Sequence, residues 1–166
     1  MKFTPQSIPD VLLIEPTIHS DGRGYFTETF RQDLFEDAIG YKVNFIQDNE
    51  SKSTKGVLRG LHYQLLPYTQ AKLVRVIEGS VLDVAVDIRK SSPTFGQHVA
   101  VELTAQNKHQ LFAPHGFAHG FVVFSDSATF AYKVDNYYAP EHDRGIAFDD
   151  DQLKIDWQLS GEELQL

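Results

Sequence analysis

Four segments of this chain combine residue types that could carry out proton-transfer chemistry. A histidine titrates near neutral pH and can act as a general base, a lysine supplies a positive charge, and a tyrosine can act as a weak acid. Each segment taken alone also has an ordinary structural interpretation as a hairpin, a hydrogen-bonded core residue or a packed aromatic ring. The segments are residues 21–28, residues 57–64, the run that begins at Lys72, and residues 114–121 with the tyrosines at 132, 137 and 138.

The segment Val57–Gln64 (VLRGLHYQ) is predicted to be a strand that holds both an arginine and a histidine. Successive side chains of a regular strand point to opposite faces. We therefore expect Arg59 to share one face with Leu61 and Tyr63, and His62 to lie on the other. A single histidine in an apolar strand is more often a hydrogen-bonded structural residue than a catalytic one.

Lys72 begins a strongly apolar run in which Val74 and Val76 fall on the same face. A lysine that points into a barrel must have a partner, because the removal of water from an ammonium group costs several kcal/mol. Asp83, on the neighbouring apolar run, is the natural partner. The alternative is a lysine at the mouth of the strand whose ammonium reaches water.

The segment of residues 21–28 (DGRGYFTE) predicts a sharp turn, because two glycines flank Arg23. Beyond this turn, the side chains of Arg23, Phe26 and Glu28 can project from a strand. An exposed hairpin without a function would have the same composition. The segment therefore indicates a function only together with the other segments.

Two short motifs resemble the metal-binding motifs of cupin barrels, but the expected ligands are incomplete. The segment His62–Gln64 is His-x-Gln, and the segment Pro114–His119 is Pro-x-Gly-x-x-His. Cupin metal sites usually have a second histidine in place of Gln64 and an acidic ligand in the region of Lys72. Because an ammonium group opposes a divalent cation, and a strong site needs more imidazole or carboxylate ligands, we expect no catalytic metal.

The elements that must position these residues are mostly short strands. Alternation in the run 80–89 puts Leu82, Val84 and Val86 on one face and Asp83 on the other. Similar runs occupy residues 72–77, 98–103, 110–112, 120–124 and 129–134, and Gly79 marks a tight turn. This pattern predicts an all-β sandwich or closed barrel.

Helix signals are sparse, and they do not change the all-β prediction. Residues 31–39 form one short candidate helix that ends at Gly40, and residues 150–153 could form a further turn. The chain of 166 residues is 42% hydrophobic, which is enough for one core. We therefore expect a single domain over residues 1–166.

Composition and charge exclude several classes of function. The chain has 23 acidic and 15 basic residues, and its formal charge of −8 disfavours binding to nucleic acid or to an anionic membrane surface. The absence of cysteine excludes disulfides, a thiolate nucleophile and cysteine-based zinc sites. The first residues hold no long apolar segment. We expect a cytoplasmic protein with no nucleic-acid or membrane partner.

Taken in order, these segments resemble the dTDP-4-dehydrorhamnose 3,5-epimerase family, and the resemblance extends over nearly the whole chain. The motifs that carry it are VLRGLHYQ, AKLVRV, DVAVDIR, SPTFGQ and GFAHGF. The resemblance implies a cupin-type jelly-roll β-barrel, a homodimer and no cofactor. It implies the substrate dTDP-4-dehydro-6-deoxy-D-glucose, inverted at C3 and C5 to give dTDP-4-dehydro-L-rhamnose.

The resemblance also implies catalytic roles. C3 and C5 both flank the C4 ketone, so a proton can leave either carbon to form an enolate, if a base, an acid and a cation are suitably placed. By resemblance, His62 is the base, Lys72 (with Asp83 as its partner) stabilises the enolate, and Tyr132 reprotonates the carbon from the opposite face.

The expected binding residues divide into cations for the diphosphate and groups for the base and sugars. Arg59 and Arg23 are expected to bind the diphosphate, with His119 donating nearby. The N-terminal segment, about residues 1–50, is expected to contribute to the dimer and to the nucleotide site. The groups expected to stack on or hydrogen-bond the thymine, ribose or sugar are Phe26, Tyr138, Glu28, Gln47 and Asn49.

The sequence departs from the family at three points. Phe112 stands where the family usually has tryptophan, and His115 stands where it often has an acidic residue. The base histidine of the family is usually partnered by an aspartate in a C-terminal tail, which would fall a few residues past Leu166. Because Leu164 and Leu166 alternate with Gln165 as in a strand, we expect the natural protein to be longer.

Other functions stay open from the sequence. A single-site epimerase, acting at C3 or C5 only, would use the same groups, and a 3,4-ketoisomerase would share the barrel without matching the epimerase segments so continuously. A non-catalytic barrel that binds sugar nucleotides would not need His62, Lys72 and Tyr132 together. A metal-dependent cupin oxygenase or isomerase is disfavoured by Gln64 and by Lys72.

Overall fold

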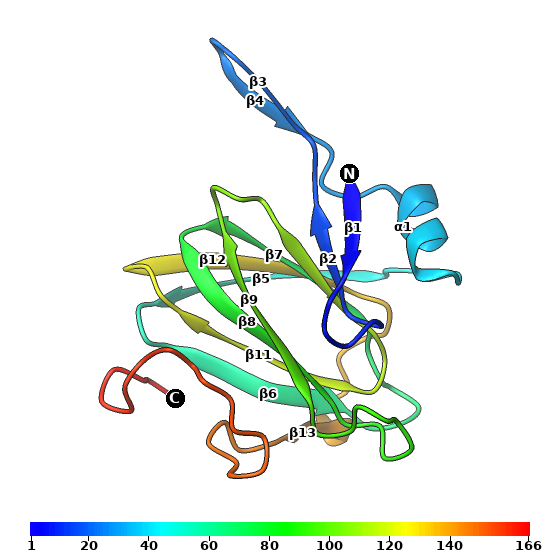
Figure 1. Ribbon diagram of the computed structural model, residues 1–166, viewed down its shortest axis with the longest axis vertical. Coiled ribbons are helices and arrows are strands. Elements are labelled where there is room, and N and C mark those ends of the chain that lie inside the picture. Colours follow the sequence, from blue (N-terminus) through cyan, green and yellow to red (C-terminus); the bar gives the residue numbers. More distant parts are fainter.

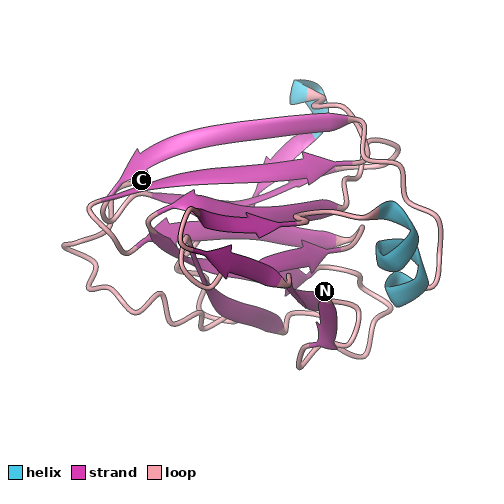
Figure 2. Ribbon diagram, turned by 90° about the horizontal axis from the view of Figure 1, so that it is seen from above, coloured by secondary structure: helices cyan, strands magenta, loops and turns pink.

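The chain folds into two facing antiparallel sheets and a separate hairpin in the computed structural model, which describes residues 1–166 (Figure 1). The six-stranded sheet has the order β1 (Lys2–Pro5), β2 (Leu12–Glu15), β10 (Gln110–Ala113), β7 (Lys72–Glu78), β12 (Ser127–Val134) and β5 (Gln47–Thr54). The five-stranded sheet has the order β13 (Asp143–Gly145), β6 (Leu58–Gln64), β11 (Phe117–Val123), β8 (Ser80–Asp87) and β9 (His98–Thr104). Figure 2 shows the sheets as two layers. The predicted all-β jelly-roll barrel is confirmed.

The alternation predicted for the run 80–89 is confirmed in β8. Val81 and Ala85 belong to the core between the two sheets, whereas Leu82 and Val84 belong to a second core on the opposite face of the five-stranded sheet. Because side chains alternate, Asp83 points into the barrel with Val81 and Ala85. Asp83 is fully buried there.

The second core lies under the C-terminal segment, which runs along the outside of the five-stranded sheet (Figure 1, orange to red). Trp157 is buried in this core, and its indole Nε1 donates a hydrogen bond to the Phe148 carbonyl at 2.9 Å. At the end of the chain, Gln165 forms a parallel bridge with Val57. The pairing at the chain end is limited to this one bridge, and Leu166 is 84% exposed.

The predicted helix is confirmed as α1 (Gln32–Ile39), which lies at one end of the barrel (Figure 2). It ends at Gly40, whose φ of 79° is a left-handed conformation that glycine adopts without strain. Phe35 packs edge-on against Phe112 at 4.9 Å between ring centroids, so Phe112 is a core residue. Residues 150–153, the second candidate, form only a turn. The chain also has a short 3-10 helix, η1 (Pro140–His142). Neither α1 nor η1 is long and apolar enough to cross a membrane.

The predicted turn at residues 21–28 is a β-hairpin that extends away from the barrel (Figure 1). It pairs β3 (Ile18–Asp21) with β4 (Gly24–Thr27) and makes no sheet contact with the rest of the chain. The aromatic side chains near its tip are exposed, and Phe26 keeps 67% of its surface accessible. We call residues 18–27 the arm.

Candidate active site

A cavity of about 920 Å³ lies between the two sheets and collects most of the predicted site residues. Its walls come from β5, β7 and β12 of one sheet and from β6, β11 and β13 of the other. The polar side chains that line it are Gln47, Asn49, Ser51, Arg59, His62, Gln70, Lys72, His119, Tyr132, Tyr138 and Asp143. The sequence prediction missed Ser51, Gln70 and Asp143.

A β-bulge places Arg59 and His62 in the same cavity, which corrects the prediction that they lie on opposite faces. In β11, His119 pairs with His62, and Phe121 pairs with Arg59. Gly60 and the residue after it therefore stand opposite one residue of β11, and the extra residue shifts the alternation of β6 by one position. The arginine and the histidine, three positions apart, now face the same side.

Glycine is required on both strands at this bulge. Gly60 has a φ of +134°, and a Cβ added to it would lie 2.5 Å from the Cα of Gly120. A Cβ on Gly120 would lie 2.8 Å from the Arg59 carbonyl oxygen. The two backbones approach each other too closely for any side chain, so the glycines of the RGLH and HGF stretches position Arg59 and His62.

Lys72 lies at the start of β7 and lines the cavity together with His62, as predicted. Burial lowers the pKa of Lys72 to about 8, while the negative charges of Asp143 and Asp83 act in the opposite direction. The ammonium is therefore still mostly protonated at neutral pH. It is a cation in a poorly solvated site, where its interaction with a developing anion is strong.

The bonded partner of Asp83 is His119 and not Lys72, which corrects the sequence prediction. The Asp83 Oδ1 lies 2.9 Å from the His119 Nε2, and both side chains are buried. No ion pair within 4.0 Å joins Asp83 to Lys72, although the charge of Asp83 acts on Lys72. This hydrogen bond fixes the orientation of the His119 imidazole.

His62 is half-exposed to the cavity and has a carboxylate near it. Its Nδ1 lies 4.0 Å from the Asp143 Oδ2, which is too long for a hydrogen bond but close enough for attraction to a protonated ring. Asp143 belongs to β13, which pairs with β6 so that Gly145 lies opposite His62. Sequence reasoning missed Asp143 because the segment around Pro140 has no strand pattern.

Tyr132 lines the cavity from β12, on the sheet that faces His62. Burial raises the pKa of its phenol, and the nearby Arg59 guanidinium opposes that effect. The phenol therefore stays protonated at neutral pH. Behind it, Phe121 and Phe130 stack at 4.1 Å between ring centroids and form an apolar part of the wall.

The predicted nucleotide-binding groups of β5 are at the cavity, as alternation requires. The Gln47 Nε2 donates to the Asn49 Oδ1 at 2.8 Å, and the backbone N–H of Tyr138 donates to the Gln47 Oε1 at 3.3 Å. The Arg59 Nε donates to the Ser53 Oγ at 3.0 Å, which holds the guanidinium at the cavity wall. These bonds connect β5 to β6 and to the Tyr138 segment.

Three predicted binding residues are absent from this cavity. Arg23, Phe26 and Glu28 lie on or beside the arm, which points away from the barrel (Figure 1). Arg23 is strongly exposed, and its guanidinium pairs with Asp21 at 2.6 Å. Within one chain, these residues do not reach His62.

Gln64, which stands where a cupin metal site has histidine, holds backbone groups instead. Its Nε2 donates to the Tyr68 and Tyr137 carbonyls at 2.6 and 3.1 Å, and its Oε1 accepts from the Ala139 N–H at 2.7 Å. No three histidine, aspartate or glutamate side chains gather as a metal site would require. Gln64 therefore fastens the loops beside the cavity through these three hydrogen bonds.

The sequence and the fold are both similar to those of known epimerases. Residues 5–166 match the family model described as dTDP-4-dehydrorhamnose 3,5-epimerase. The dTDP-4-dehydrorhamnose 3,5-epimerase of Shigella flexneri is 59% identical over 159 residues, which are 96% of this chain and 88% of that protein.

Solved structures extend this similarity to the fold. A crystal structure of dTDP-6-deoxy-D-glucose-3,5-epimerase from Legionella pneumophila Philadelphia 1, in complex with dTDP-4-keto-L-rhamnose, superposes with a TM-score of 0.95 at 52% identity, covering 99% of this chain and 86% of that one. ChmJ, a 3′-monoepimerase from Streptomyces bikiniensis in complex with dTDP-quinovose, superposes with a TM-score of 0.88 at 35% identity, covering 97% and 80% of the two chains.

Proposed function

This chain belongs to the dTDP-4-dehydrorhamnose 3,5-epimerase family, and from that premise we propose that its cavity inverts C3 and C5 of dTDP-4-dehydro-6-deoxy-D-glucose through enolate intermediates. The enzyme is an isomerase of dTDP-L-rhamnose biosynthesis. One observation carries the mechanism: His62 stands on one sheet, and Lys72 and Tyr132 stand on the facing sheet of the same cavity.

His62 removes the proton from the carbon next to the ketone. A neutral imidazole suits this role because its ordinary pKa lies near the working pH. The ring becomes positively charged when it takes the proton, and the carboxylate of Asp143, 4.0 Å from Nδ1, stabilises that charge. Asp143 therefore affects the reaction by stabilising the protonated form of His62.

Lys72 stabilises the negative charge that develops on the C4 oxygen. Its ammonium is poorly solvated, so it interacts more strongly with an enolate than a surface lysine would. Asp143 and Asp83 keep the ammonium charged near neutral pH by their negative charges. The role of Asp83 is indirect, because its own hydrogen bond goes to His119.

Tyr132 donates a proton to the opposite face of the carbon and so inverts it. Its raised pKa keeps the phenol protonated until the enolate forms, and the charge of Arg59 stabilises the phenolate that remains. The base and the acid come from facing sheets, which gives protons access to the two faces of the sugar. Solvent resets both groups before the second carbon reacts.

Arg59 and His119 bind the diphosphate, and Gln47, Asn49 and Tyr138 bind the nucleoside. Support comes from their shared position on the cavity wall. Arg59 and Lys72 both line this cavity, and a local pair of cations outweighs the net charge of −8 at short range. An acidic protein can therefore bind an anionic ligand.

The arm completes the site of a second copy in a homodimer. Arg23, Phe26 and Glu28 are groups suited to a nucleotide, yet they lie on or directly after a hairpin that extends from the barrel without sheet partners. An exposed apolar tip on an extended hairpin is typical of a segment that is covered by another chain. Residues 1–50 thus contribute to the dimer mainly through the arm.

The direct test is incubation with dTDP-4-dehydro-6-deoxy-D-glucose in heavy water, followed by NMR of the sugar protons. Deuterium at both C3 and C5, with product of the inverted configuration, is the expected result. Deuterium at neither carbon would exclude the epimerase mechanism and leave a sugar-nucleotide-binding protein.

A single-site epimerase is the second candidate, and the structural similarity to the 3′-monoepimerase ChmJ favours it. The same base, acid and cation would serve one carbon as well as two. Stable deuterium at one carbon only, after complete conversion, would identify this activity.

A further inference from the structure

A cluster of three side chains lies behind the wall of the active-site cavity and does not line it. His115, in the turn between β10 and β11, places its Nε2 2.7 Å from the Asp135 Oδ2. Its Nδ1 lies 3.2 Å from the Thr69 hydroxyl. The three residues come from three different loops.

Asp135 connects His115 to a loop that borders the cavity. Its second oxygen, Oδ1, accepts the backbone N–H of Ala71 at 2.7 Å. The next residues of both loops are joined as well, because the Gln70 Nε2 donates to the Asn136 carbonyl at 2.8 Å. Residues 65–71 and residues 135–139 are therefore fastened together around one carboxylate.

These two loops carry cavity residues that are not themselves part of a barrel strand. Gln70 and Tyr138 line the cavity from the loops. Lys72 is different, because it is paired with Ala113 on one side and with Val134 on the other. A change at the carboxylate would therefore move Gln70 and Tyr138 more than Lys72.

The charges around His115 favour its protonated form. The hydrogen bond to Asp135 raises the pKa of His115, although partial burial opposes this. Arg89 packs against Gly116 of the same turn, but its guanidinium is already paired with Asp87 and with Asp10 at 2.7 Å.

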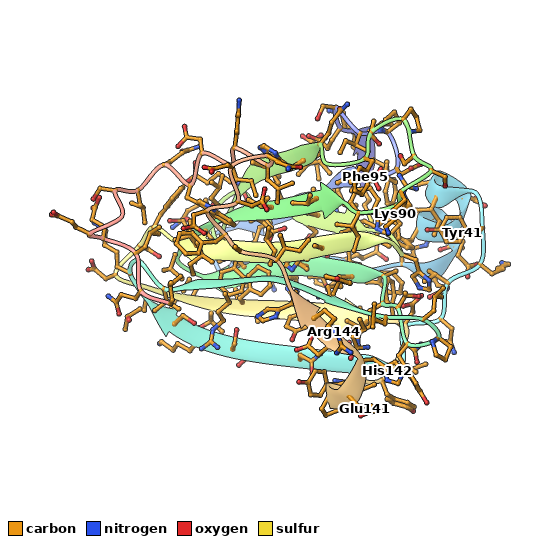
Figure 3. All side chains as sticks on the ribbon, turned by 90° about the horizontal axis from the view of Figure 1, so that it is seen from below. Tyr41, Lys90, Phe95, Glu141, His142 and Arg144 are labelled. Carbon is orange, nitrogen blue, oxygen red and sulfur yellow. The ribbon has the colours of Figure 1, made fainter.

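Tyr41 is the remaining titratable group that responds to Asp135. Burial first, and then the charges of Asp135 and Asp10, raise the pKa of its phenol, so Tyr41 is neutral in the same pH range. Figure 3 shows Tyr41 near the end of the barrel that also carries Lys90 and Phe95. Asp135 is the carboxylate that is bonded to His115.

We propose that His115 is a positioning residue whose protonated imidazole clamps Asp135, and that this clamp holds Gln70 and Tyr138 in place for the nucleotide. The inference rests on the proposed function, because it takes the cavity to be a nucleotide site. The clamp gives the enzyme a pH-dependent affinity that is separate from its catalytic groups.

The direction of the pH effect follows from the shift of the histidine. A histidine whose pKa is raised in the folded protein stabilises the structure fully below its ordinary value of about 6.5, and this contribution is lost as pH rises through the folded-state value. The clamp is therefore closed below the ordinary value and weakens as pH rises through the raised pKa of His115. Binding of the nucleotide weakens with it.

Affinity for dTDP, measured by titration calorimetry from about pH 5.5 to about pH 8.5, tests the clamp without catalysis. In the wild type, the Kd is expected to rise about three- to tenfold over this range, the equivalent of one weakened charge-assisted hydrogen bond. His115→Gln keeps a donor but cannot titrate, so its Kd should be raised already at low pH and should change less with pH.

His98→Gln is the matched control, because His98 lies on the edge strand β9 and lines no part of the cavity. Its Kd values should follow the wild type at each pH. The KM of His115→Gln should rise with its Kd, while kcat stays within about twofold, because Lys72 is held by its strand neighbours. An NMR titration of the His115 ring should give a pKa that falls when Asp135 is replaced by Asn.

Equal Kd values for wild type and His115→Gln across the pH range would overturn the clamp, even if the enzyme is active. A wild type that binds no dTDP at any pH would instead overturn the proposed function. A His115 pKa that is unchanged in Asp135→Asn would show that the two side chains are not coupled in solution, and it would also overturn the clamp.

Discussion

At the scale of single residues, the chemistry depends on environments that differ between similar groups. His62 is half-exposed with a carboxylate at 4.0 Å, whereas His119 is buried and bonded to Asp83 at 2.9 Å. The first can exchange a proton with a substrate, and the second is committed to its partner. This contrast supports His62 as the base and His119 as a binding group.

The base and the acid should fail in different ways when they are replaced. His62→Ala removes the group that takes the proton, so deuterium incorporation at both carbons should fall by about 10²–10⁴-fold. Tyr132→Phe leaves the base in place, so proton loss should continue while net inversion falls. NMR in heavy water separates exchange from inversion. Full exchange by His62→Ala would show that another group is the base.

The alkaline limit of activity should depend on Asp143 through Lys72. The kcat/KM of the wild type, which reports the free enzyme, should fall as pH rises through about 8, where the Lys72 ammonium loses its proton. Asp143→Asn removes a charge that raises this pKa, so the fall should begin at lower pH. We expect the kcat/KM of Asp143→Asn to drop by about two- to fivefold more at mildly alkaline pH than at neutral pH.

Glu141→Gln is the control for the lost negative charge. Glu141 lies on the neighbouring short helix, beside His142 and Arg144 at the edge of the five-stranded sheet (Figure 3), and it does not line the cavity. Its pH profile should match the wild type. An unshifted profile in Asp143→Asn would show that the alkaline limit does not report Lys72.

At the scale of elements, one irregularity in a strand assembles the site. The bulge between β6 and β11 turns Arg59 and His62 to the same side, and it exists because two glycine backbones meet at Gly60 and Gly120. Regular pairing would have left either His62, the proposed base, or Arg59, the proposed phosphate-binding cation, facing the C-terminal segment. The bulge is thus both a structural and a functional feature.

Gly60→Ala should therefore destabilise the fold and reduce activity together. The new Cβ would meet the Gly120 backbone, and alanine is strained at a φ of +134°. We expect a loss of about 1–3 kcal/mol in the free energy of unfolding, measured with denaturant. Gly22→Ala is the control, because no atom lies within 4 Å of the added Cβ. Equal stability of the two variants would contradict the tight contact.

At the scale of the whole molecule, the arm separates the predicted site into two parts. The barrel holds the proposed acid, base and central cation, while Arg23 and Phe26 extend beyond it. A second copy of the chain can unite the two parts, because a twofold dimer lets each arm reach the other barrel. Sedimentation at micromolar concentration should accordingly show a dimer.

Mixed dimers test whether the arm acts on the other subunit. A chain with Arg23→Ala and Phe26→Ala keeps its barrel intact, and a His62→Ala chain keeps its arm intact. If each arm serves the partner, co-refolding the two inactive proteins should restore up to about a quarter of wild-type activity, since half of the dimers then hold one complete site. Activity no greater than the sum of the separate variants would show that the arm does not complete the partner's site.

Local pattern was sufficient for much of this protein. Alternation in residues 80–89 predicts that Asp83 lies on the face opposite Leu82 and Val84, and alternation from Lys72 puts Lys72 on one face with Val74, because the side-chain period of a strand is a property of the backbone itself. The helix that ends at Gly40 follows from equally local rules. The family motifs then identify the chemistry.

Only the tertiary structure decided how these residues meet. The alternation of β6 fails at Gly60 because its partner strand, distant in sequence, comes too close for a side chain. Asp143 joins the site only because β13 pairs with β6. Asp83 bonds His119 from the neighbouring strand. Such contacts depend on register and on neighbouring strands, which no local period encodes.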